Sequence, residues 1–184
     1  MTELNEHITI VGFRNVKIMN INTFLERFRK ENKGAPIQFF DAKHVAGSQH
    51  IYFAALNALY AFNKKTNISN RIAVEALLYA SAQRQITKAV KMLGIKQESS
   101  EVAALIMTEN GHKKADYVRL VTDIISGERD DNVLELTEQK ISNIKKLFEI
   151  SDLEFEAKLQ KEGQEKEALT DLVIERMALL GTKN

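Results

Sequence analysis

Short stretches of alternating or unbroken apolar residues mark three predicted strands. Residues 7–13 (HITIVGF) alternate apolar and polar side chains, which predicts a half-buried strand. Pro36 precedes the stretch IQFFDA at residues 37–42, and a proline is compatible with the first residue of a strand or with an edge. The unbroken apolar run VAALIM at residues 102–107 predicts a strand that is covered on both faces. The sheet is therefore expected to be small.

Apolar residues at helical spacing fill the chain between these strands. One helix is predicted from a cap at Asn22 to a stop at Gly34. A second helix is predicted from a cap at Ser48 to about residue 63. Because the second helix is apolar nearly all round, we expect it to lie at the centre of the fold.

The longest helical stretch is predicted over residues 69–80 and 83–93, and Gly94 ends it. In its second helix four apolar residues are expected to face the core: Ile86, Ala89, Val90 and Leu93. Three basic residues share the opposite face: Arg84, Lys88 and Lys91. Arg71 and Glu75 are four residues apart and can pair, which makes Glu75 a structural partner rather than a catalytic acid.

The C-terminal half of the chain also has helical spacing. A helix is predicted over about residues 115–125 and ends at Gly127, and Thr137 is expected to cap another. Ser151 and Glu154 have the spacing of a capping box. The last helix is amphipathic, with five apolar residues in register: Leu169, Leu172, Val173, Met177 and Leu180. Such a terminal helix either completes the core or forms a docking surface.

Together these elements predict an α/β protein of the α+β type. A small antiparallel or mixed sheet is expected to be flanked by many helices, including a C-terminal amphipathic helix. The 184 residues fit a single domain over 1–184, in which about 128–184 form a helical extension packed on the body. The polar start, the lack of a long apolar run and the absence of cysteine lead us to expect a cytoplasmic protein without a membrane segment.

The near-neutral net charge hides an asymmetry along the chain. Residues 1–127 carry 17 basic and 11 acidic side chains, a balance of +6, whereas residues 128–184 carry 9 and 14, a balance of −5. Within residues 60–95 six basic side chains stand against Glu75 alone. This asymmetry indicates either a basic patch for an anionic partner or a solvated lysine face.

The motifs of common enzyme classes are absent from the sequence. There is no glycine-rich phosphate loop, no GxSxG elbow and no kinase signature set, and without cysteine there is no thiolate zinc site. Asp41, His44 and His50 form a possible metal or acid–base group, although they lack a third nitrogen ligand and the HExxH spacing. The alternative is that Asp41 simply ends a strand. We therefore expect a non-catalytic protein with no cofactor, no metal and no small-molecule substrate.

A set of motifs in the chain resembles a known family. The motifs are Asn70-Arg71, Glu75, Leu77-Leu78-Tyr79, Arg84-Gln85-Ile86, Gly94-Ile95, Asp41-Ala42, Gly47 with His50, and the segment 174–180. In their order along the chain they are similar to the archaeal form of the PRPK-binding (Cgi-type) small subunit of the KEOPS complex. They cover most of the chain, and the central motif at 70–95 is the most specific.

The resemblance implies a non-catalytic subunit of the assembly that makes threonylcarbamoyladenosine in tRNA. It implies two partners, which are the small atypical kinase/ATPase of that complex and the single-stranded 3′ CCA end of tRNA. The residues then expected to bind tRNA are Lys64, Lys65, Asn70, Arg71, Arg84, Gln85, Lys88 and Lys91. Those expected to bind the kinase are Arg176, Leu179 and Leu180.

Two other functions remain open at this point. The protein is alternatively an interaction module that docks on the kinase, regulates it and touches no RNA. Single residues also have alternatives: Arg84 pairs with an acidic residue of the fold, and the terminal helix with Arg176 and Leu179 closes the core instead of docking the kinase. The second alternative is an enzyme that uses Asp41, His44 and His50. The position of these side chains in the fold bears directly on both alternatives.

Overall fold

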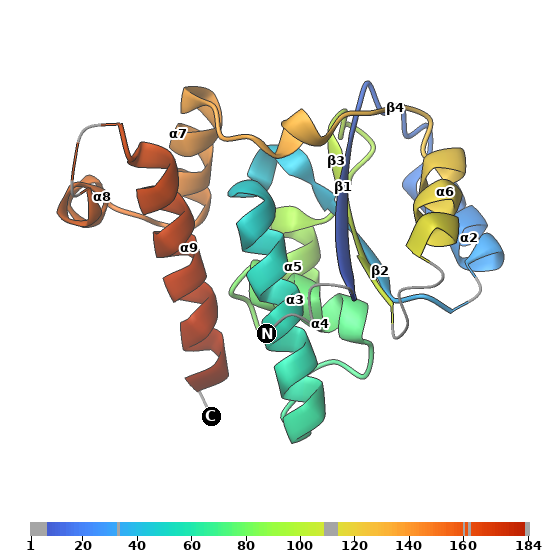
Figure 1. Ribbon diagram of the computed structural model, residues 1–184, viewed down its shortest axis with the longest axis horizontal. Coiled ribbons are helices and arrows are strands. Elements are labelled where there is room, and N and C mark those ends of the chain that lie inside the picture. Colours follow the sequence, from blue (N-terminus) through green and yellow to red (C-terminus); the bar gives the residue numbers. More distant parts are fainter. Residues whose placement is uncertain (1–6, 33, 109–113, 160, 162, 183–184) are drawn as a thin grey trace.

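The computed structural model describes residues 7–32, 34–108, 114–159, 161 and 163–182. Within these ranges the chain forms eight α-helices and a four-stranded antiparallel sheet (Figure 1). The predicted α+β class is therefore confirmed. None of the helices in these ranges is both long enough and apolar enough to cross a membrane.

The sheet has the strand order β2-β3-β1-β4. Its strands are β1 (Ile8–Arg14), β2 (Ile37–Asp41), β3 (Val102–Met107) and β4 (Glu128–Arg129). All six residues of β3 are buried, because this strand lies inside the sheet and is covered on both faces as its apolar run predicts. The three predicted strands are confirmed. Strand β4 was not predicted, since it consists of two exposed charged residues that pair with the end of β1.

Helices cover the sheet on both sides. On one side lie α2 (Ile21–Glu31) and α6 (Lys114–Ile124), and on the other α3 (Gly47–Lys64), α4 (Ile72–Ala80) and α5 (Ile86–Leu93) (Figure 1). The alternation along β1 supplies both cores. Val11 and Phe13 join the core under α2 and α6, whereas Ile8 joins the core under α3.

Helix α3 is central, as its nearly uniform apolar surface predicts. Four alanines on its inner face are fully buried: Ala54, Ala55, Ala58 and Ala61. Because these side chains are small, α3 packs closely against α4, whose residues 75–80 are all buried. The pairing of these two helices fixes the position of everything that follows α4.

Three helices complete the C-terminal part, namely α7 (Glu138–Leu147), α8 (Asp152–Lys158) and α9 (Glu165–Thr182). The predicted cap at Thr137 and the capping box of Ser151 and Glu154 are both confirmed. The five apolar residues predicted to be in register on the last helix are all buried: Leu169, Leu172, Val173, Met177 and Leu180. They belong to the same core cluster as the inner face of α3, beside which α9 lies (Figure 1).

The predicted ends of the first helix were wrong. Asn20 rather than Asn22 caps α2, because its side-chain oxygen accepts the backbone N–H of Thr23 at 3.0 Å. The helix ends at Glu31, before Gly34, and the N–H of the following residue closes the last turn. A side-chain bond therefore sets the first end of α2, and a backbone bond closes its last turn.

Two other predicted helix ends also shift. Helix α3 begins at Gly47 after Ala46, which supplies no capping side chain, so Ser48 lies inside the helix and is not its cap. Helix α6 ends at Ile124 rather than at Gly127. A methyl group on Gly127 would lie 2.7 Å from the carbonyl oxygen of Arg14, which shows that this glycine allows close chain contact.

Helices α4 and α5 each begin three residues later than predicted, at Ile72 and Ile86. The residue before each helix, Arg71 or Gln85, has an extended backbone and provides no capping bond from its side chain. Between the helices Ala82 takes a left-handed conformation with φ of 52°. The residue before each helix is thus extended, and the segments that enter the two helices carry half of the predicted tRNA-binding residues: Asn70, Arg71, Arg84 and Gln85.

Candidate functional site

Helix α5 forms an exposed ridge with a narrow buried face. Of its apolar residues, Ala89 and Leu93 are fully buried, whereas Ile86 is 47% exposed and Val90 is 45% exposed. The prediction that Ile86 and Val90 face the core was therefore wrong. A short helix that packs mainly against α4 buries only one narrow stripe, and apolar residues beside that stripe remain at the rim.

An apolar groove lies on the Ile86 flank of this ridge. Its volume is about 470 Å³, and it is bordered by α2, the start of edge strand β2, α4 and α5. Ile72, Ile86 and Val90 contribute aliphatic surface to it, while Arg29 and Arg71 contribute the charged groups. No acidic side chain is among the described residues that line the groove. The groove is therefore apolar in its walls and cationic in its charge.

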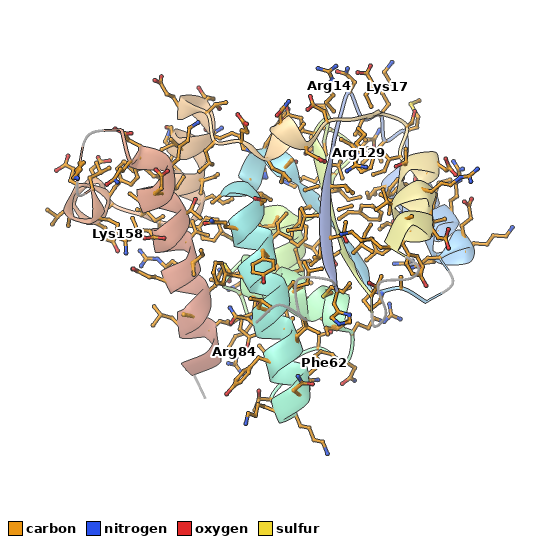
Figure 2. The ribbon with its side chains drawn as sticks, in the orientation of Figure 1. Arg14, Lys17, Phe62, Arg84, Arg129 and Lys158 are labelled. Atoms are coloured by element: carbon orange, nitrogen blue, oxygen red, sulfur yellow. The ribbon has the colours of Figure 1, made fainter. Side chains whose placement is uncertain are left out.

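A second hollow, of about 550 Å³, lies on the Lys88 flank between α5, α7 and α9. Six of the predicted binding residues line it: Arg84, Gln85, Lys88, Arg176, Leu179 and Leu180. Figure 2 shows Arg84 near the C-terminal end of α9, and its guanidinium donates to the carbonyl oxygen of Leu180 at 3.4 Å. Three of the predicted tRNA-binding residues and all three predicted kinase-binding residues thus surround one hollow.

The eight predicted tRNA-binding residues do not meet in one place. Arg84, Gln85 and Lys88 line the second hollow, and Arg71 lines the first groove. Lys91, whose side chain is exposed, follows Lys88 by three residues on the outer face of α5. The remaining members flank α4 and end α3: Lys64, Lys65 and Asn70. The ridge of α5 separates the two hollows, so a ligand that uses both must cross it.

The ridge also differs in charge pairing from the opposite end of the molecule. Figure 2 shows Arg14, Lys17 and Arg129 at the end away from Arg84. There Arg14 lies 3.0 Å from a carboxylate oxygen of Glu128, and Arg129 forms a further ion pair. Across the described ranges, by contrast, no ion pair is formed by the two lysines of α5. Their charges remain available to an anionic ligand.

Glu75 fixes the segment that enters α4. Its carboxylate is fully buried and accepts the backbone N–H groups of Ile68 at 3.0 and 3.1 Å and of Ser69 at 2.7 Å. The side-chain pair with Arg71 that the spacing allowed is not formed among the described contacts; only backbone groups of the two residues bond, from Glu75 N–H to Arg71 carbonyl at 2.9 Å. Glu75 is a structural residue, but its partners are the backbone amides of the preceding loop.

The three predicted kinase-binding residues differ in exposure. Leu180 is buried, and Arg176 donates to a carboxylate oxygen of Glu154 at 2.8 Å and to the carbonyl of Glu149 at 3.4 Å. The Arg176 bond, together with bonds from Ser151, lowers the pKa of Glu154 to about 2. Leu179, in contrast, is 50% exposed. Of the three, Leu179 therefore offers the largest apolar contact surface.

Asp41, His44 and His50 do not form the proposed metal or acid–base group. His50 is fully buried; its Nδ1 accepts the Ala46 N–H at 3.0 Å and its Nε2 bonds the Ala80 carbonyl at 2.8 Å, so both ring nitrogens are engaged. Burial lowers its pKa to about 4 and keeps the ring neutral. Asp41 accepts the Lys43 N–H in its own turn and the Ser99 hydroxyl at 2.7 Å. His44 Nδ1 lies 3.9 Å from the Asp41 carboxylate, so these two residues are close, but no group of three possible ligands is placed to hold a metal ion in the described part of the chain.

Sequence reasoning missed the apolar groove and the contribution of Arg29 to it. Arg29 lies in the helix predicted from Asn22 to Gly34, but nothing in the local pattern related it to Arg71, 42 positions along the chain. The groove requires the packing of α2 and α4 against the same edge of the sheet. Ile86 and Val90 were the residues of α5 that could have indicated the groove, but helical spacing alone assigned both to the core.

The fold and these surfaces define a class: a small α+β binding protein whose candidate site is a cationic, partly apolar surface formed by helix α5 and the helix ends around it. The chain belongs to the kinase binding protein CGI-121 family, whose sequence model matches residues 13–181. It is 33% identical over 119 residues to the Regulatory protein Cgi121 of Methanocaldococcus jannaschii, across 65% of this chain and 74% of that protein. The chain is therefore a Cgi121-type member of a family of kinase-binding regulatory proteins.

Proposed function

We propose that this protein is the non-catalytic subunit of an archaeal KEOPS complex, which makes threonylcarbamoyladenosine in tRNA. In the cytoplasm it binds the small atypical kinase/ATPase of that complex and the 3′ CCA end of tRNA. Family membership supports the kinase as a partner. The observation that carries the RNA function is the α5 ridge, where exposed Ile86 and Val90 adjoin cations on both flanks.

The chemistry of this surface suits an unpaired RNA end. Arg71, Lys88 and Lys91 neutralise phosphates, which makes binding salt-dependent. The unstacked bases of a single strand then rest on Ile86 and Val90, since exposed bases seek an apolar surface. Base-paired RNA has no free base faces to place there, so the groove favours the single-stranded end over the duplex stem.

Polar side chains at the two helix entries supply contacts to base edges. Asn70 precedes α4 and Gln85 precedes α5, and both are exposed. Gln85 makes no capping bond with its side chain, so its amide is free of that role. Side-chain amides both donate and accept hydrogen bonds, as the Watson–Crick edges of bases require.

The C-terminal part of α9 is the proposed kinase-docking element. Leu179 supplies the apolar contact, while Arg176 and Leu180 hold the helix end in place through Glu154 and through the core. An exposed leucine beside a packed helix end is a suitable anchor for a partner's apolar pocket. Because Arg84 bonds the Leu180 carbonyl, this docking element adjoins the RNA surface.

The alternative function, a regulatory module that binds the kinase but no RNA, also has an observation in its favour. Arg84, one of the predicted RNA contacts, is engaged with the carbonyl of Leu180 inside the protein. On this alternative the basic residues of α5 are a solvated surface. The two functions differ in what a change of charge on α5 does to tRNA binding.

Charge reversal on α5 tests the RNA function. The double variant Lys88→Glu/Lys91→Glu leaves the core untouched and is expected to weaken tRNA binding. The slope of the logarithm of the binding constant against the logarithm of the salt concentration is expected to become shallower by about 1.4, because each lost contact to a single-strand phosphate changes this slope by about 0.7. Arg119→Glu on α6, which is also exposed, is the matched control. Filter retention of tRNA with and without its CCA end at several salt concentrations measures both quantities. Equal retention of wild type and double variant supports the module that binds no RNA.

The kinase function is tested separately at α9. Leu179→Glu is expected to abolish binding of the small kinase while tRNA retention stays within a factor of about two, because the substitution removes none of the cations of the RNA surface. Titration calorimetry with purified kinase measures the first, and the filter assay measures the second. Wild-type affinity of Leu179→Glu for the kinase excludes this end of α9 as the docking element.

A further inference from the structure

The carboxylate of Glu75 has an unusual environment, because it is fully buried and bonds only backbone amides. It accepts the N–H groups of Ile68 and Ser69, with the shortest distance 2.7 Å, to Ser69. In the described part of the chain no ion pair joins it to an arginine, lysine or histidine. Burying a carboxylate is costly unless its oxygens are hydrogen-bonded. The fold meets that requirement with the loop before α4, so the loop and the carboxylate depend on each other.

Ser69 passes this constraint on to the residues that face the groove. Its hydroxyl oxygen accepts the backbone N–H of Arg71 at 3.2 Å, and its carbonyl accepts the side-chain amide of Asn67 at 3.1 Å. The Arg71 carbonyl in turn accepts the Glu75 N–H at 2.9 Å. The backbone of residues 67–71 is therefore tied at both ends to the first turn of α4.

The side chains that project from this fixed segment are exposed. Asn70 and Arg71 are both at the surface, and Arg71 lines the apolar groove beside Ile72. Among the described contacts the Arg71 guanidinium has no partner of its own. Only its backbone is held, and it is held through Ser69 and Glu75. The position of the charged group thus depends on a carboxylate that never reaches the ligand.

We infer that Glu75 is a positioning residue for RNA binding, which fixes Asn70 and Arg71 at the groove before the ligand arrives. The inference rests on the RNA function proposed above. Prior ordering lowers the entropy lost on binding. A glutamine at position 75 keeps the shape but offers one acceptor oxygen and places an N–H₂ group against backbone N–H donors. The loop then loosens, and Arg71 must be ordered by the RNA itself.

The experiment compares Glu75→Gln, Arg71→Gln and the double variant in the full chain, with a tRNA transcript that ends in CCA. Glu75→Gln is expected to bind about threefold to tenfold more weakly, the factor that corresponds to ordering one long side chain on binding. The double variant is expected to bind no more weakly than Arg71→Gln alone, because the effect acts through Arg71. Affinity for the kinase is expected to stay at the wild-type value in all three.

Thr137→Ala is the matched control, since it removes the cap of α7 and so lowers the melting temperature away from the groove. Its tRNA affinity is expected to equal that of wild type, which separates positioning from general destabilisation. If Glu75→Gln lowers the soluble yield, Ser69→Ala removes only the bond to Arg71 and is expected to weaken tRNA binding in the same direction.

Two results overturn the inference in different ways. The positioning role alone is overturned if Glu75→Gln binds tRNA with wild-type affinity while Arg71→Gln binds it more weakly. It is also overturned if the losses of the two single variants add up in the double variant. An unchanged affinity of Arg71→Gln overturns RNA binding by this segment, and the positioning role with it. Neither pattern by itself decides the proposed function, which the Lys88→Glu/Lys91→Glu variant on α5 tests independently of Glu75 and Arg71.

Discussion

His50 makes the stability of this protein sensitive to mild acid. Its ring is fully buried between the start of α3 and the end of α4, where it bonds Ala46 and Ala80 and lies edge-on to Phe148 at 5.6 Å. The Nδ1 atom accepts a hydrogen bond there, so a protonated ring loses that bond and becomes an unpaired buried charge. Lowering the pH is therefore a specific perturbation of this contact.

The size of the effect follows from the shift in the pKa of His50. Burial lowers its pKa from 6.5 to about 4, so between these two values the unfolded chain binds a proton that the folded chain does not. The contribution is fully present above pH 6.5 and is lost as the pH falls toward 4. Each unit of pKa shift corresponds to about 1.4 kcal/mol, so the titration of His50 lowers the free energy of unfolding by about 2 kcal/mol between neutral pH and pH 5.

The assay compares wild type with His50→Gln by urea unfolding from pH 8 to pH 4.5. Titrating carboxylates contribute alike to both proteins, so they cancel in the difference between the two free energies of unfolding. This difference is expected to be constant above pH 7 and to shrink by about 2 kcal/mol by pH 5. The interval above pH 7 serves as the internal control. A difference that stays constant down to pH 5 refutes a neutral, buried His50 as the origin of the acid sensitivity.

Three further predictions concern packing. Gly12→Ala is expected to cost about 1–3 kcal/mol in thermal unfolding, because the added methyl group would lie 2.5 Å from the Asp130 carbonyl oxygen. Leu169→Ala, at a fully buried position of α9, is expected to cost about 2–5 kcal/mol and to leave one cooperative transition; a separate early transition would show that α9 unfolds independently. Ile86→Glu is expected to fold and to lose tRNA binding, whereas Ala89→Glu, one turn away but fully buried, is expected to unfold. Circular dichroism measures folding and the filter assay measures tRNA binding. Unfolding of Ile86→Glu would contradict the exposed position of this residue on the ridge.

Much of the fold was predictable from the apolar pattern. The run VAALIM identified an inner strand because a strand with helices on both faces has no polar side. The nearly uniform apolar surface of residues 48–63 identified α3 as central for the same reason. The register of α9 was also correct, since its five apolar residues all reach the core. Periodicity predicts such elements well when burial extends over several turns.

Boundaries and rims were less predictable because side-chain contacts from elsewhere decide them. The start of α4 moved to Ile72 because Glu75 holds the backbone amides of Ile68 and Ser69 outside the helix. Helical spacing placed Ile86 and Val90 with Ala89 and Leu93, but the ridge buries only the latter pair. The width of the buried stripe on a helix depends on the elements that pack against it, and the sequence of that helix alone does not specify them.

The surface around α4 and α5 owes its shape to three polar anchors from different parts of the chain. Glu75 holds the loop before α4, His50 holds the Ala80 carbonyl at its end, and Arg84 reaches the Leu180 carbonyl across the second hollow. The first two anchors are fully buried, so they are shielded from any ligand at the surface, yet they fix the turns from which the exposed residues project. The motif at residues 70–95 therefore combines two kinds of residue, exposed ones with the chemistry for an anionic ligand and buried ones that hold those in place. Only the exposed part of the motif is therefore available for binding, while the buried part determines its geometry.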